Sequence, residues 1–213
     1  SYQFAALLAM METAKKMQPS GKLMEAFEVN FIDSCNKAGY SEEIINNSKS
    51  YALDISQQIL SYAQADGYNK ISNLQRYTPR KTDSSWYPTP PGFLPAVEPN
   101  FNTVRPFTLD SADQFRPLAP VAYNPKAGSP FYELTSAVYK EGNDLKDEHR
   151  LIASFWDCNP FAMQDEGHLM FGFKKISPGA QWLGITGMAC IEANRSFDET
   201  MQIYTSVAVG WMD

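Results

Sequence analysis

The residues that could do acid–base or metal chemistry are few in this 213-residue chain. It has two histidines, His149 and His168, and the second closely follows the acidic pair Asp165–Glu166. A serine hydrolase would need a histidine beside a nucleophile elbow, and the sequence contains no Gly-x-Ser-x-Gly. The spacing around His168 is not that of a zinc site, which favours a partly exposed loop histidine. The residues by themselves therefore show no active site.

The cysteines and arginines do not indicate an active site either. Cys35, Cys158 and Cys190 are odd in number and widely spaced, which predicts buried free thiols rather than a metal site. Arg105–Pro106 and Arg116–Pro117 are the candidates for binding an anion. Arginines in a proline-rich segment more often donate to loop carbonyls, and we expect that role for both.

The overall composition excludes some classes of partner. Apolar residues make up 44% and charged residues 20% of the chain, an ordinary globular balance. The net charge of −6 argues against nucleic acid or an acidic membrane surface as the main partner. Apolar runs fall short of the roughly 20 residues that would span a bilayer, so no membrane span is predicted in this chain.

Three helices are predicted in an N-terminal segment, residues 1–76. The third begins at Ser41, a good N-cap, and ends at Gly67. Apolar residues recur at helical spacing in all three helices, and these stripes are expected to face the core. In the third helix the stripe is Ile44, Tyr51, Ile55, Ile59 and Tyr62.

Residues 77–130 form a proline-rich segment, called the strap below. Eleven of the fourteen prolines fall between Thr78 and Pro130, which excludes long helices and central strands. Aromatic residues are nevertheless spread through it, so we expect an ordered strap docked by its rings rather than a free linker. An exposed ligand for a proline-binding domain is the alternative. The rings expected to be mostly buried are Trp86, Phe93, Phe101, Phe107 and Phe115.

Helices return in the last segment, residues 131–213. Ser129–Pro130 and Ser177–Pro178 each combine an N-cap with proline at the first helical position. A helix is predicted over 147–156 with Leu151, Ile152 and Phe155 facing inward, and Ser196 opens the last helix with a capping box. Gly184 and Gly187 are expected to permit close helix packing. Sustained strand alternation is lacking, so the predicted fold class is all-α, a helical bundle with a long ordered strap.

Several runs of this sequence resemble the vanadium-dependent haloperoxidase-like branch of the type 2 phosphatidic-acid-phosphatase superfamily, which includes acid phosphatases. The resemblance covers nearly the whole chain. It implies an all-helical fold in which helical bundles hold a vanadate or phosphate ion. The runs that carry it are Trp86–Pro91, Val97–Phe101, Val104–Phe107, Asp113–Pro117, Phe155–Pro160, Gly167–His168 and Lys174–Gly179.

The family builds its anion pocket from three motifs, Lys-x6-Arg-Pro, Pro-Ser-Gly-His and Ser-Arg-x5-His. None occurs in this sequence, and Pro19–Lys22 only imitates the second, with Lys22 in place of the histidine. The resemblance therefore implies that this chain is the part before the catalytic motifs and holds no catalytic residue, cofactor or metal itself. It further implies that Asp157, Asn159 and His168 would lie just outside the ion's direct ligands. Helix capping is the alternative for Asp157 and Asn159.

The last helix carries an apolar stripe still running at Trp211–Met212, with no stop signal. We expect Trp211 to be buried against other helices and the native chain to continue helically past Asp213.

The predicted function is the scaffold portion of a vanadate-dependent haloperoxidase-like or acid-phosphatase-like enzyme, whose catalytic segment is this chain's partner. The alternative is a non-catalytic helical structural or interaction protein. The resemblance implies a periplasmic or cell-surface location, and a homo-oligomer remains open.

Overall fold

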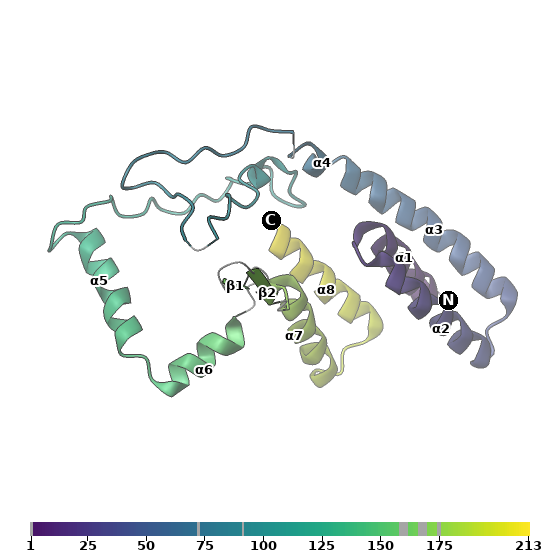
Figure 1. The fold of residues 1–213 in the computed structure, drawn as a ribbon. Helices are drawn as coiled ribbons and strands as arrows, with labels where there is room; N and C mark the ends of the chain where they lie inside the picture. The colour runs from purple at the N-terminus through teal and green to yellow at the C-terminus, as the bar shows by residue number, and fades with distance from the viewer. Residues whose placement is uncertain (1, 72, 91, 158–161, 166–169, 174–175) are drawn as a thin grey trace. The chain divides into compact units, whose positions relative to one another are not determined.

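The computed structural model describes residues 2–71, 73–90, 92–157, 162–165, 170–173 and 176–213. Most of the secondary structure within them is helical, as Figure 1 shows, so the predicted all-α class is confirmed. The chain divides into two compact units. One comprises Ser1–Asn73 with Thr103–Arg105, and the other Leu74–Asn102 with Pro106–Asp213. In the described part of the chain, no helix is long and apolar enough to cross a membrane.

The first unit is built from three helices, α1 (Tyr2–Met17), α2 (Met24–Lys37) and α3 (Glu42–Gln64). A short 3-10 helix η1 (Gly21–Leu23) joins α1 to α2, and α4 (Tyr68–Ile71) follows α3. The predicted signals at the ends of α3 are confirmed. The Ser41 hydroxyl accepts the N–H of Ile44 at 3.3 Å, and Gly67 has φ 92°, the left-handed region that glycine adopts at little cost.

The core of this unit lies where α1 packs along α3. Phe4 and Leu8 of α1 are buried, and Leu8 is only 1% exposed. The buried residues of α3 are mostly small rather than the large ones predicted. They are Ile45, Ser48, Ala52 and Ser56.

The predicted stripe of α3 is therefore wrong except at Ile55, which packs against the core. Ile44, Tyr51, Ile59 and Tyr62 are exposed, and Ile55 is half-buried. Small side chains at Ser48, Ala52 and Ser56 are spaced three to four residues apart, so they too form one face of the helix. They let the two helix backbones approach closely, which large residues would prevent. Hydrophobic spacing predicts that a helix has an inward face, but here packing geometry decides which face it is.

The described residues of the strap form no long helix before α5 begins at Pro130, as the prolines predict, and they include the 3-10 turn η2 (Phe101–Thr103). Its aromatic rings are not buried in this chain. Trp86, Phe93, Phe101 and Phe107 are exposed, and Phe115 is 76% exposed. The prediction of ring burial is thus wrong for these residues. Prolines keep the strap extended, and it docks by the polar contacts described below.

The second unit contains α5 (Pro130–Asn143), α6 (Asp147–Trp156), α7 (Pro178–Glu192) and α8 (Phe197–Met212). Their starts are as predicted. Ser129 and Ser177 accept backbone N–H groups ahead of a proline, and Ser196 forms a complete capping box with Glu199. No residue of α5, α6 or α8 is buried. The inward orientation predicted for Leu151, Ile152 and Phe155 is wrong, because all three are exposed.

A short antiparallel hairpin, β1 (Ala162–Asp165) and β2 (Met170–Phe173), lies between α6 and α7. Ala162 pairs with Phe173 and Asp165 with Met170. The sequence does not predict these strands, because four residues are too few to show a clear alternation of apolar and polar side chains.

Helices α7 and α8 form a hairpin, and they lie side by side in Figure 1. Of Gly184 and Gly187 in α7, only Gly187 has the predicted packing role. A Cβ added at Gly187 would come within 2.5 Å of the Tyr204 hydroxyl oxygen, whereas a Cβ at Gly184 would meet nothing within 4 Å. The turn between the helices contains Asn194 at φ 50°, a conformation that asparagine tolerates better than most residues.

Candidate functional site

The predicted site residues cluster after α6, and Asp157 is the one that the structure describes. It is the C-cap of α6, with extended backbone (φ −74°, ψ 90°), and its N–H donates to the Ser154 carbonyl at 3.4 Å. Asp157 is exposed. Because it ends a helix rather than starting one, it does not take the N-cap role that aspartate most often has. A role beside an anion pocket stays a prediction.

Aromatic contacts hold the end of α6. The Phe155 and Trp156 rings meet edge to face with centroids 5.1 Å apart. Trp156 also contacts Trp182 of α7, with centroids 6.3 Å apart. These are ordinary distances for favourable aromatic pairs. The residue before Asp157 is therefore anchored to α7, which limits where the Asp157 carboxylate can lie.

The other two predicted site residues, Asn159 and His168, lie outside the described residues, as do Lys174–Lys175. Whether they approach Asp157 stays a prediction. Cys158 is also outside the described residues, while Cys35 and Cys190 are buried free thiols, as predicted.

The strap is attached to the last residue of the chain. The Asp213 carboxylate accepts the N–H of Phe107 at 2.6 Å and the N–H of Thr108 at 2.8 Å, and it also accepts the Thr108 hydroxyl. The hydroxyl of Thr108 contributes most to lowering the pKa of Asp213, followed by the backbone donors, and together they outweigh the opposing effect of desolvation. Asp213 is thus held as a carboxylate by neutral donors of the strap.

Arg105 makes the contacts expected of a structural arginine. Its Nη2 donates to the Tyr62 carbonyl, in the last turn of α3, at 2.8 Å. Its guanidinium carbon lies 3.8 Å from the centroid of the Tyr62 ring, a cation–π contact. The Nε atom is buried without a hydrogen-bond partner in the described residues. The expectation that Arg105 binds a carbonyl is confirmed. Arg116 differs, because it pairs with the carboxylate of Asp113.

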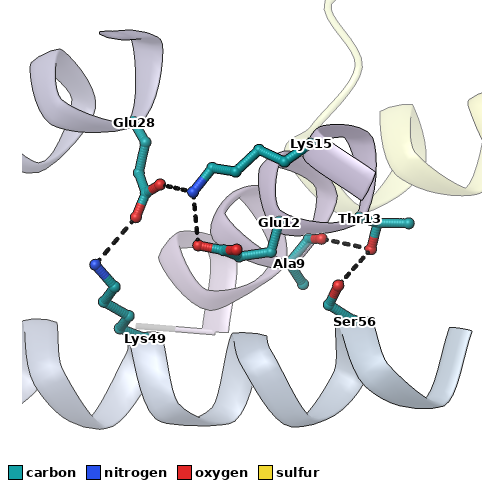
Figure 2. Close-up of polar contacts among 7 residues, drawn as sticks. All are labelled: Ala9, Glu12, Thr13, Lys15, Glu28, Lys49 and Ser56. Atoms are coloured by element: carbon teal, nitrogen blue, oxygen red, sulfur yellow. Dashed lines mark hydrogen bonds and ion pairs between the residues drawn. The ribbon is translucent and has the colours of Figure 1, made fainter. Parts of the chain in front are cut away.

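The most enclosed charges of the chain's first unit lie between α1, α2 and α3, as Figure 2 shows. Lys15 of α1 pairs with Glu12 at 2.9 Å and also with Glu28 of α2, which is 6% exposed. Lys49 of α3 approaches the other oxygen of Glu28 at 3.2 Å. One carboxylate therefore ties three helices together.

Protonation of this cluster follows from its contacts. Burial alone would raise the pKa of Glu28, but the hydrogen bonds and charges of Lys15 and Lys49 outweigh burial and lower it. Burial alone would lower the pKa of Lys15, and the contacts with Glu12 and Glu28 outweigh it and raise that pKa. Glu28 and Lys15 therefore stay charged at neutral pH, which suits a structural ion-pair network rather than proton transfer.

No group of three or more His, Cys, Asp or Glu side chains in the described ranges could hold a metal ion. Arg105 and Arg116, the arginines considered for anion binding, are occupied by Tyr62 and Asp113. These two arginines are therefore engaged by other groups of this chain rather than gathered around an anion site.

Comparison with solved structures places the chain beside a known enzyme structure. The chain is similar to the protein described as the first bacterial vanadium-dependent iodoperoxidase, with 34% sequence identity and a TM-score of 0.83. The similarity covers 100% of this chain and 50% of that one, so this chain spans half the length of the relative it matches. No family model matches the chain, and neither does any curated protein.

Proposed function

We propose that this chain, which resembles a vanadium-dependent haloperoxidase along its whole length, is the scaffold portion of a vanadate-dependent haloperoxidase-like or acid-phosphatase-like enzyme. In this proposal the oxyanion-binding motifs lie in a segment after residue 213, and the 213 residues alone are not catalytic.

The observation that carries the proposal is the extent of the match. At 34% identity, all of this chain corresponds to only half of the iodoperoxidase. The three anion-binding motifs expected from the resemblance are absent from this sequence. Together these facts support a division in which one half supports the fold and the other binds the ion.

Vanadate or phosphate fits this proposal only as a ligand of the other segment. When bound, vanadate supplies the peroxide-activating chemistry of halide oxidation, and no step of it is assigned to this chain. The residues of this chain hold elements in place: Asp213 and Arg105 fix the strap, and Trp156 anchors the turn at Asp157. Asp157 is proposed to hydrogen-bond an arginine of the oxyanion pocket from outside.

Titration with vanadate tests the proposal directly. The purified 213-residue chain and the native polypeptide that contains it are each titrated in a calorimeter. We expect stoichiometric binding and vanadate-dependent iodide oxidation from the longer polypeptide and neither from the 213-residue chain. Stoichiometric binding by the 213-residue chain would overturn the proposal. Phosphoester hydrolysis without halide oxidation would identify a phosphatase.

A longer polypeptide that binds no oxyanion and lacks Lys-x6-Arg-Pro would instead support the non-catalytic structural protein. The extracytoplasmic location is part of the same proposal. Cell fractionation checks it, and recovery of the native protein in the cytoplasmic fraction would contradict it.

A further inference from the structure

A groove runs between α7 and α8 on the second unit. Trp182, Ile185 and Ala189 of α7 line it together with Ile203 and Val207 of α8. It encloses about 320 Å³. That volume is at the lower end of the range for small-molecule pockets, about 300–1,000 Å³.

Two polar side chains of this groove, Thr186 and Arg195, already have partners. The Thr186 side chain is buried, and its hydroxyl donates to the Trp182 carbonyl at 2.8 Å. Arg195, at the turn between the helices, pairs with Glu199 at 3.3 Å. The lining is mostly apolar and so offers little to a polar ligand. The groove is suited to apolar side chains.

We propose that this groove, called the α7–α8 groove, is the docking site for an apolar helix face from the segment that the iodoperoxidase has and this chain lacks. The inference rests on the proposed function. A groove between two packed helices can receive a third helix through residues spaced i, i+3 or i+4, and i+7.

The occupant is argued from two observations. Half of the matched relative has no counterpart in this chain, and under the proposed function the native protein has a comparable segment that would cover the groove. The apolar surface also continues beyond the groove, because α8 has no buried residue and Trp211 is 51% exposed. A pocket for one small molecule would not need this extended apolar surface, whereas a helical segment would cover it.

Hydrogen exchange measured by mass spectrometry tests the inference without any ligand. Amide exchange in α7 and α8 is compared between the 213-residue chain and the native polypeptide that contains it. We expect slower exchange at both helices in the longer polypeptide. Equal exchange in the two forms would overturn the inference. Protection that appears in the 213-residue chain alone as its concentration rises would overturn it too, because a second copy would then fill the groove.

A pair of substitutions locates the effect. Ala189→Glu places a charge in the groove, and Met188→Glu places the same charge on a neighbouring residue that does not line the groove and is 65% exposed. In the 213-residue chain both should leave the unfolding transition nearly unchanged, since both positions are exposed. In the longer polypeptide Ala189→Glu should abolish the extra protection and Met188→Glu should not. Equal effects of the two would contradict the groove as the docking site.

Failure of this inference is distinguishable from failure of the proposed function. If the longer polypeptide binds vanadate but amide exchange in α7 and α8 is not slowed, the proposed function stands and the docking site is contradicted. If exchange in α7 and α8 is slowed but the longer polypeptide does not bind vanadate, the docking site stands and the enzymatic function is contradicted.

Discussion

Arg105 lies over the ring of Tyr62, with its guanidinium carbon 3.8 Å from the ring centroid, and donates to the carbonyl of the same residue at 2.8 Å. A second hydrogen bond is made by the backbone N–H of Arg105, which donates to the Asp66 carbonyl at 2.9 Å. A cation beside the last carbonyls of α3 also complements the negative end of the helix dipole. Residues Thr103–Arg105 are by these contacts the part of the strap that docks on the first unit.

Replacing Arg105 should release this docking. Arg105→Lys keeps the charge but loses the planar stacking on Tyr62, and we expect it to cost about 1 kcal/mol of unfolding free energy in urea. Tyr62→Phe should have little effect, because the ring and the backbone carbonyl remain. Arg116→Lys is the control, since Arg116 forms an exposed ion pair. An Arg105→Lys protein as stable as the wild type would contradict the structural role.

The Glu28 cluster should make the stability of the first unit depend on pH at both extremes. The pKa of Glu28 is lowered, so its stabilisation is complete above the ordinary glutamate pKa, about 4.3, and is lost as pH falls through the lowered value. The pKa of Lys15 is raised, so its contribution is complete below about 10.4 and is lost as pH rises through the raised value. Urea unfolding followed across pH measures both limbs.

Substitutions in the cluster separate its members. Glu28→Gln should remove most of the loss of unfolding free energy at acid pH. It should also reduce the loss at alkaline pH, since Lys15 then has only Glu12 as an ion-pair partner. Lys15→Met should cost about 1.5–3 kcal/mol, the range for hydrogen bonds to charged groups. Glu25→Gln, on the exposed part of the same helix, is the matched control. If Glu28→Gln and Glu25→Gln gave the same pH profile, the cluster would not determine acid stability.

Asp213 should hold the strap only while it is ionised. Its pKa is lowered, so the strap contact is complete above the ordinary aspartate pKa, about 3.9, and is lost as pH falls through the lowered value. Asp213→Ala should speed amide exchange at Phe107 and Thr108 and increase protease cleavage nearby. Thr108→Val should have a smaller effect, because it removes the hydroxyl and keeps both N–H donors. Unchanged exchange in Asp213→Ala would show that the strap is held by other contacts.

Gly184 and Gly187 of α7 should respond differently to alanine. Gly184→Ala meets nothing within 4 Å and should raise the unfolding free energy by about 0.5–1 kcal/mol, because alanine favours the helix. Gly187→Ala should gain less or lose stability, since its Cβ would lie 2.5 Å from the Tyr204 hydroxyl oxygen. Adding Tyr204→Phe should recover the gain. Thermal unfolding compares the three variants, and equal gains at both glycines would contradict the packing role of Gly187.

Local signals in the sequence determined where the helices begin and end. Ser41, Ser129, Ser177 and Ser196 all cap helices as predicted, because a cap needs only a hydroxyl and a backbone N–H three residues later. The prolines likewise determined that the strap would be extended, since each one removes a donor wherever it stands.

Orientation and burial were decided by the tertiary structure. Ile44 and Tyr51 share a helical stripe, but the small side chains of Ser48, Ala52 and Ser56 pack against α1 because they allow the closer approach. The rings of the strap were expected inside and are exposed. The contacts that hold it link distant residues, Arg105 with Tyr62 and Thr108 with Asp213. Helical spacing shows that apolar residues share one face of a helix. Which surface covers that face depends on residues far along the chain, so a local pattern cannot predict it.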